Sequence, residues 1–163
     1  MITFLVENKE YSLSDIYQYI HDRPTLTLSE EIQSQINASR KILDDAVSED
    51  KVIYGVNTGF GKLSQVKIHK DKISELQENL ILSHAVGVGK PIPDDITILI
   101  ILLKIISLSK GYSGIRLTVV QRLVDMLNND CLPLIPCQGS VGASGDLAPL
   151  SHMTLPLLGV GDV

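Results

Sequence analysis

Hydrophobic residues recur along most of the chain at intervals of three and four, the spacing that gathers them on one face of a helix. The segment that follows the capping-box pattern Thr27-Leu28-Ser29-Glu30 shows this spacing at Ile32, Ile36, Leu43 and Val47. The same pattern predicts further helices over 14–21, 70–85, 94–109, 117–129 and 146–158. We therefore expect a mainly α fold.

The most hydrophobic stretch runs from Ile96 to Ile106 and is interrupted by Thr97 and Lys104. It is too short to cross a bilayer, which takes about 20 residues. A helix that is apolar on most sides is a buried helix, so this stretch is expected in the core. Pro93 and the two aspartates that follow it are typical of a helix N-terminus.

Only the N-terminus shows a strand pattern. Thr3 to Val6 and Glu10 to Ser12 read as two short strands joined by a turn at Asn8-Lys9, which predicts a short β-hairpin. No linker or internal repeat divides the rest, and 163 residues are enough for one domain with a core. The expected fold is thus a mainly helical domain, 1–163, with a short β-hairpin near its N-terminus.

Composition narrows the possible partners. Hydrophobic residues make up 44% and charged residues 20%, which excludes a disordered chain. A net charge of −5 without a basic cluster argues against nucleic acid and anionic membrane as partners. Cys131 and Cys137 lack the spacing of a metal site, so no metal is expected, and with no secretion signal at the N-terminus a reducing cytoplasm is the simplest location.

The most unusual chemistry lies in Gly139-Ser140-Val141-Gly142-Ala143-Ser144-Gly145-Asp146-Leu147-Ala148-Pro149-Leu150. Ala143-Ser144-Gly145 can bend tightly enough for the Gly145 amide nitrogen to attack the Ala143 carbonyl. Loss of two waters, one involving the Ser144 hydroxyl, leaves a 4-methylidene-imidazol-5-one, which is an electrophile that no ordinary side chain supplies. Read alone, the tripeptide is more often a turn before a helix that Asp146 caps.

Two further segments carry candidate site residues. Tyr54-Gly55-Val56-Asn57-Thr58-Gly59-Phe60-Gly61 is a glycine-rich loop whose spacing fits neither a dinucleotide nor a Walker phosphate site. Ile73, Leu76, Leu80 and His84 recur at helical spacing, so His84 ends a predicted buried stripe and Ser83 precedes it. A lone tyrosine is usually a packing residue, and a histidine in this position is either a core residue or a neutral imidazole facing a polar pocket.

Together these segments resemble the aromatic amino acid ammonia-lyase family, in the same order along the chain and over nearly all of it. The resemblance implies that Tyr54 is the catalytic acid/base and that Ala143, Ser144 and Gly145 form the methylidene-imidazolone, with Asp146 in support and no external cofactor. In this family the residues at the positions of Ser83 and His84 discriminate between substrates. Phenylalanine-selective members tend to have Phe-Leu, tyrosine-selective members His-Leu and histidine-selective members Ser-His, so with Ser83 and His84 this chain resembles the histidine-selective branch.

The implied reaction is the elimination of ammonia from L-histidine to trans-urocanate in a cytoplasmic homotetramer. Family chains are much longer, so the 163 residues are expected to be an incomplete N-terminal part, inactive by itself, without the downstream helical core. Two alternatives stay open. One is a tyrosine or phenylalanine ammonia-lyase or an aromatic aminomutase, and the other is a non-catalytic helical assembly domain that kept the motifs.

Overall fold

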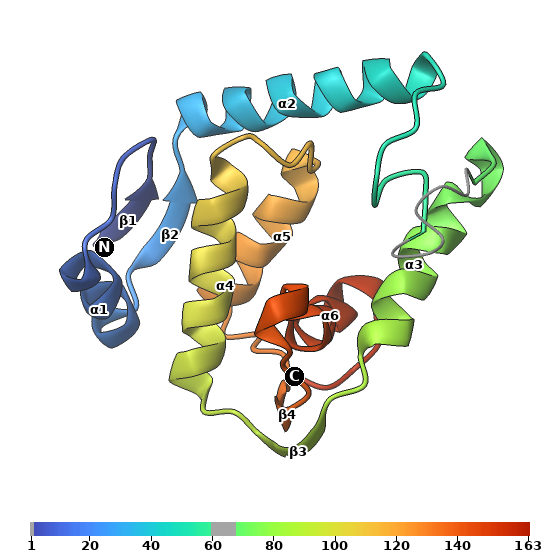
Figure 1. Ribbon diagram of the computed structural model, residues 1–163. Coiled ribbons are helices and arrows are strands. Elements are labelled where there is room, and N and C mark those ends of the chain that lie inside the picture. The colour runs from blue at the N-terminus through green and yellow to red at the C-terminus, as the bar shows by residue number, and fades with distance from the viewer. Residues whose placement is uncertain (1, 60–67) are drawn as a thin grey trace. The chain divides into compact units, whose positions relative to one another are not determined.

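The computed structural model describes residues 2–59 and 68–163, and the regular structure in them is mostly helical (Figure 1). The mainly α fold class is thereby confirmed. The α-helices of these residues are α1 (Leu13–Asp22), α2 (Glu30–Ser48), α3 (Ile73–His84), α4 (Asp94–Ser109), α5 (Leu117–Asn128) and α6 (Leu147–Thr154). Short 3₁₀ turns are η2 (Lys70–Lys72), η3 (Gly142–Ser144) and η4 (Leu155–Leu158).

The predicted helices agree with these bounds to within one residue except at three ends. The helix predicted over 70–85 begins as an α-helix only at Ile73, after the 3₁₀ turn η2. The helix predicted over 146–158 changes to the 3₁₀ turn η4 at Leu155, because Pro156 has no N–H to donate and its ring disfavours a continuing α-helix. The N-cap of α2 is also two residues later than predicted. Thr27 lies in a strand, and it is the Ser29 hydroxyl that accepts the Ile32 N–H, at 3.2 Å.

The predicted β-hairpin is wrong. β1 (Thr3–Val6) pairs in parallel with β2 (Thr25–Leu28), with Phe4 opposite Leu26, and α1 forms the crossover between them. The segment predicted as the second strand is used for capping α1 instead. The Ser12 hydroxyl and the Ser12 amide donate to the Asp15 carboxylate at 2.7 and 2.8 Å, and these two bonds hold the pKa of Asp15 below its ordinary value. The Ser12 hydroxyl also accepts the Asp15 N–H, which completes the capping box.

Contacts divide the chain into two compact units. The first consists of Met1–Ile42, Ile92–Leu132 and Val163, and the second of Leu43–Pro91 and Pro133–Asp162. All candidate site residues belong to the second unit.

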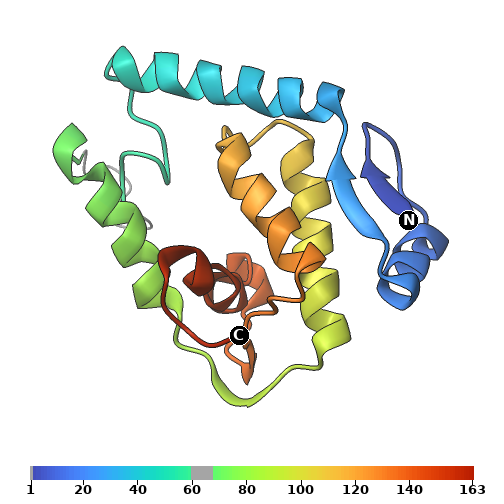
Figure 2. The same ribbon diagram turned by 180° about the vertical axis from the view of Figure 1, so that it is seen from behind.

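The core of the first unit lies between α4 and its neighbours. α4 packs along α5, which lies beside it in both views, and against α1 (Figures 1 and 2). Ile101, Leu102 and Ile105 are fully buried, as expected for α4. Ile96 and Leu103 remain 41% and 47% exposed, so the helix is buried on one side and not all round.

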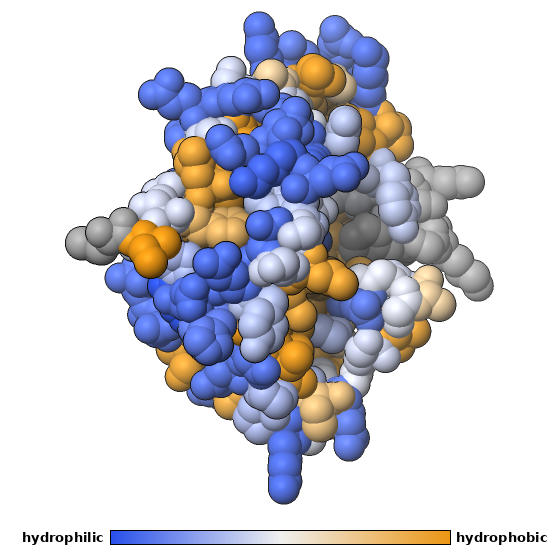
Figure 3. Space-filling model, turned by 90° about the vertical axis from the view of Figure 1, so that its left-hand side faces the viewer, coloured by the Kyte–Doolittle hydropathy of each residue, from blue (hydrophilic) through white to orange (hydrophobic). Residues whose placement is uncertain are grey.

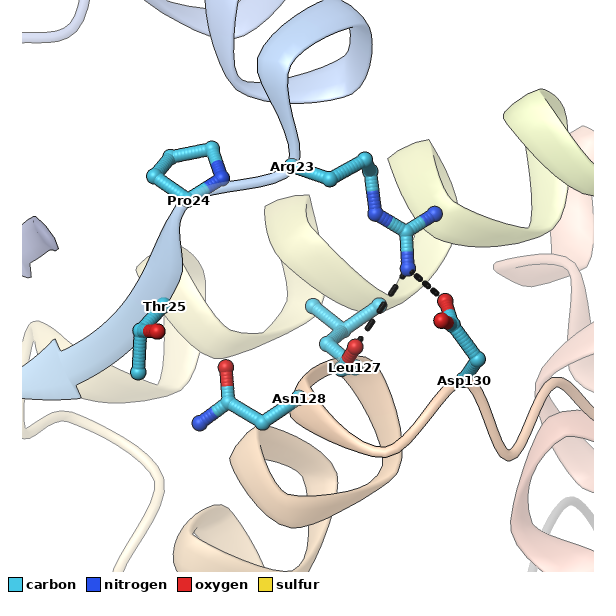
Figure 4. Close-up of a pocket in the computed structure, with 6 residues that line it drawn as sticks. All are labelled: Arg23, Pro24, Thr25, Leu127, Asn128 and Asp130. Carbon is cyan, nitrogen blue, oxygen red and sulfur yellow. Dashed lines mark hydrogen bonds and ion pairs between the residues drawn. The ribbon is translucent and has the colours of Figure 1, made fainter. Parts of the chain in front are cut away.

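Polar side chains form hydrogen bonds between the segment that joins α1 to β2 and the end of α5 (Figure 4). The Asn128 amide forms a two-bond pair with the Leu26 backbone, accepting from its N–H at 2.8 Å and donating to its carbonyl at 2.9 Å. The Arg23 guanidinium donates to the Leu127 carbonyl at 3.3 Å and pairs with Asp130. Asn128 thus satisfies backbone groups of β2 that β1 does not reach, and so protects the strand edge.

The second unit is built around α3 and α6, which pack against each other. β3 (Val88–Pro91) and β4 (Pro136–Gln138) pair antiparallel beside them. Ala148, Ser151 and Met153 of α6 are buried, whereas no residue of α3 is. The stripe predicted to be buried along α3 is therefore only half-buried, because the hollow between α3 and α6 stays open.

Hydrophobic side chains reach the surface in several places. On the face drawn in Figure 3 they appear in separate patches between hydrophilic ones. No helix in the described ranges, 2–59 and 68–163, combines the length and the hydrophobicity needed to cross a membrane.

Candidate active site

The loop that carries Tyr54 is organised by Asn57, whose side chain is almost fully buried. Its carbonyl oxygen accepts the Ile53 N–H and its amide donates to the Lys51 carbonyl, both at 2.8 Å. Gly55 takes a positive φ of 71°, which a residue with a Cβ adopts only at a cost. These contacts turn the chain sharply at Tyr54, whose side chain is 64% exposed. Phe60 and Gly61, the last residues of the predicted loop motif, lie outside the described residues.

The Tyr54 loop is also bonded to α3. The amide nitrogen of Gln77 lies 3.1 Å from the carbonyl oxygens of both Gly55 and Val56. Sequence reasoning missed Gln77, because nothing in its immediate neighbourhood marks it as more than a polar residue on a helix.

Ser83 and His84 end α3. The imidazole Nδ1 of His84 lies 2.6 Å from the Leu80 carbonyl oxygen, which can only accept, so Nδ1 carries the proton. The Ser83 hydroxyl donates to the same carbonyl at 3.1 Å and lies 3.3 Å from Nδ1. In the tautomer that the bond from Nδ1 selects, Nε2 is the acceptor nitrogen.

A hollow of about 150 Å³ lies between α3 and α6. It is lined by Gln77, Leu80, Ile81, His84, Leu147 and Ser151. The fold thus brings His84 together with the helix that directly follows the Ala-Ser-Gly signature. Tyr54 and the signature residues themselves do not line this hollow.

Ala143, Ser144 and Gly145 form one tight, exposed turn at η3. The Gly145 N–H donates to the Gly142 carbonyl at 3.1 Å, and the Ser144 hydroxyl donates to the Val141 carbonyl at 2.8 Å. Gly145 has a φ of 94°, and no atom lies within 4 Å of the position a Cβ would take. The chain therefore makes a tight turn at the tripeptide, with open space beside the Gly145 Cα.

Asp146 does not cap α6, contrary to the interpretation of the tripeptide as an ordinary helix-capping turn. It occupies the N-cap position with a left-handed backbone, φ 56°, and makes no side-chain cap bond. Its carboxylate instead accepts a hydrogen bond from the Ser140 hydroxyl. Because the left-handed backbone does not direct the side chain at the first helical amides, the carboxylate braces the loop before the signature.

His152 was not singled out from the sequence, yet it joins the two helices of the site. Its Nε2 accepts the Gly87 N–H at 3.0 Å, three residues after His84. Burial lowers the pKa of His152 from its ordinary value of 6.5, which favours the neutral form that can accept this bond. The signal for His152 was that it is the titratable residue of α6, but its partner lies 65 residues away.

Known proteins match the chain in both sequence and fold. The histidine ammonia-lyase of Streptococcus gordonii is 48% identical over 156 residues, which are 96% of this chain and 30% of that protein. The structure of histidine ammonia-lyase from Trypanosoma cruzi superposes with a TM-score of 0.84 at 35% identity, over 99% of this chain and 31% of that one. For Pantoea agglomerans phenylalanine aminomutase the TM-score is 0.87 at 36% identity, over 95% of this chain and 29% of that one.

A sequence profile of a protein family also matches nearly the whole chain. The sequence profile described as aromatic amino acid lyase covers residues 11–163. The chain spans about a third of the length of the curated relatives it matches. Since the profile covers nearly all of the chain and the solved structures share its fold, the resemblance in the sequence is confirmed and this chain belongs to the aromatic amino acid lyase family.

Proposed function

We propose that this chain is the N-terminal part of an ammonia-lyase that converts L-histidine to trans-urocanate. The observation that carries the proposal is the position of His84, which lines the hollow between α3 and the helix that follows Ala143-Ser144-Gly145. Similarity to histidine ammonia-lyases from several bacteria supports the choice of substrate. The activity is proposed for the whole protein, since the chain spans only 30% of the Streptococcus gordonii relative.

Ala143, Ser144 and Gly145 fit the role of a self-made electrophile. Their turn leaves Gly145 uncrowded at a positive φ, and the Ser144 hydroxyl, whose loss completes the ring, is exposed. When formed, the methylidene-imidazolone supplies an electrophilic carbon that makes the substrate amine a better leaving group. The bond from Ser140 to Asp146 supports the turn from the side of α6. No external cofactor is needed.

Tyr54 is the proposed general base that takes the β-proton of the substrate. A tyrosine serves in this way when its phenol is ionised and within hydrogen-bond reach of the proton. Its loop suits the task because the backbone is fixed by Asn57 and Gln77, while the phenol projects outward with most of its surface exposed.

His84 is the proposed reader of the substrate side chain, with Ser83 beside it. Because Nδ1 donates to the Leu80 carbonyl, Nε2 presents an acceptor, which matches an imidazole N–H of histidine. A phenyl ring has no donor to offer there, and a site built to bond a polar group discriminates against an analogue that lacks it.

The alternative within the family is an aromatic aminomutase or a tyrosine or phenylalanine ammonia-lyase. It is favoured by the fold match to the phenylalanine aminomutase of Pantoea agglomerans, at a TM-score of 0.87. A non-catalytic assembly domain remains the alternative outside enzymes.

Two free cysteines, Cys131 and Cys137, accord with the proposed cytoplasmic location.

A substrate panel tests the proposal. The full-length protein is incubated with L-histidine, L-tyrosine and L-phenylalanine, and the acrylate and β-amino acid products are separated. We expect urocanate from histidine and little product from the other two. His84→Leu should impair histidine turnover far more than folding, whereas His21→Leu, the same change at an exposed site in α1, should leave it unchanged. Equal or faster turnover of tyrosine, β-amino acid products, or no reaction with any substrate would contradict the assignment.

A further inference from the structure

Gln77 makes an unusual pair of contacts for a helix surface residue. Its amide nitrogen lies 3.1 Å from two successive carbonyl oxygens, those of Gly55 and Val56. Both partners are acceptors, so only the NH₂ end of the amide satisfies them. One half-buried side chain on α3 therefore holds two consecutive peptide groups of the Tyr54 loop.

The same helix face carries His84. Gln77, Leu80, Ile81 and His84 follow the spacing of one helical face, and all four line the hollow. His84 lies seven positions after Gln77, which is about 10 Å along a helix axis. The face thus fixes the Tyr54 loop at one end and presents the proposed substrate reader at the other.

We propose that Gln77 is a positioning residue that sets the place of the Tyr54 phenol relative to His84. The inference rests on the proposed function, in which Tyr54 moves a proton of a substrate that His84 orients. Tyr54 is 64% exposed, so burial does little to fix its ring, and the position of the loop backbone contributes to where the phenol lies. Asn57 shapes that backbone from within, and Gln77 anchors it to α3.

The expected effect on turnover follows from the geometry of proton transfer. A misplacement of about 1 Å in a catalytic group costs on the order of 10²-fold in rate. Loss of the Gln77 donors should therefore lower kcat about 10- to 100-fold with little change in KM, since Gln77 acts on Tyr54 and not on substrate binding.

Three substitutions separate donor chemistry from size. Gln77→Lys keeps hydrogen-bond donors, Gln77→Met keeps the length without donors, and Gln77→Glu replaces donors with acceptors that repel both carbonyls. We expect kcat to fall in the order Gln, Lys, Met, Glu. Asn79→Met is the matched control, because Asn79 lies on the exposed side of the same helix.

A double-mutant cycle with Tyr54→Phe identifies the route of the effect. If Gln77 works through Tyr54, Gln77→Met should lower kcat in the parent protein and have no further effect in the Tyr54→Phe background. Equal fold-losses in both backgrounds would overturn the proposal, as would a loss of kcat in Gln77→Met no larger than in Asn79→Met.

Hydrogen exchange gives a readout that does not depend on turnover. Gln77→Met should speed amide exchange in the loop at Ile53 and Asn57 while leaving α4 unchanged. Unchanged exchange in the loop would refute the anchoring role even in an inactive protein. If the parent protein fails to act on histidine but Gln77→Met still exchanges faster in the loop, the proposed function is contradicted and the anchoring role of Gln77 is supported.

Discussion

The phenol of Tyr54 is the group on which proton transfer depends. Tyr54→Phe removes that hydroxyl from an exposed side chain and leaves the buried Asn57 that shapes the loop in place. We expect kcat for histidine to fall by roughly 10²–10⁴-fold, the range typical of general acid–base catalysis, with little change in the melting temperature. Steady-state kinetics and thermal denaturation measure the two effects. A variant with near-normal kcat would remove Tyr54 from the reaction.

The candidate residues differ in how far sequence could identify them. Tyr54, Ser83, His84 and Ala143-Ser144-Gly145 stand in continuous motifs that resemble those of the family, and this resemblance selected them. Gln77 and His152 act through partners 22 and 65 residues away, and no local pattern encodes such contacts. The side-chain role of Asp146 also escaped prediction, because it depends on a left-handed backbone at the start of α6.

At the scale of elements, the edge of β2 depends on a single side chain of α5. Asn128→Ala leaves the N–H and carbonyl of Leu26, a residue only 1% exposed, without their partner. Each lost bond to a buried backbone group costs about 1 kcal/mol, so we expect a loss of about 1–2 kcal/mol in unfolding free energy. Chemical denaturation measures it. Asn129→Ala is the control, because the Asn129 side chain donates to the Asp125 carbonyl at the exposed end of α5. An equal loss of unfolding free energy in this control would contradict the role of Asn128.

The helices were easier to predict than the strands. A helix is predicted from the local periodicity of its hydrophobic residues, and the predicted range 94–109 coincides with α4. The parallel pairing of β1 with β2 depends on residues about twenty positions apart and on α1 between them. Glu10 to Ser12 read as a strand because a short alternating pattern does not distinguish an edge strand from the lead-in to a capped helix.

The link between the end of α3 and α6 should depend on pH through His152. Burial lowers the pKa of this imidazole below its ordinary value of 6.5, so its contribution to stability is complete above that pH. It is lost as the pH falls from 6.5 through the folded-state pKa, because the unfolded chain then binds a proton that the folded chain resists.

His152→Gln tests this dependence because a glutamine can accept the Gly87 N–H but does not titrate. The denaturation midpoints of parent and variant are compared from about pH 8 to about pH 5. We expect their difference to shift steadily against the parent as the pH falls. A constant difference over this range would show that His152 carries no linked proton.

For the whole molecule, the second unit displays hydrophobic side chains that an assembly would cover. Val86, Val88 and Val141 are 66%, 61% and 57% exposed. The family resemblance implies a homotetramer, and exposed apolar side chains are common at interfaces. We therefore propose that the full-length protein sediments as a homotetramer and that Val88→Glu weakens the assembly. Analytical ultracentrifugation over a range of concentrations measures this. A parent protein that stays monomeric at all concentrations would contradict the expectation.

We propose that this ammonia-lyase forms its electrophile from its own backbone at residues 143–145. The direct measurement is the mass of the peptide containing Ala143-Ser144-Gly145, taken from the same full-length preparation that turns over L-histidine. We predict a peptide lighter than its sequence by two waters. Ser144→Ala should be inactive and lack the full loss of two waters, with its fold intact, because the missing hydroxyl lies on an exposed turn. A preparation that forms urocanate while carrying the unmodified peptide would contradict the claim.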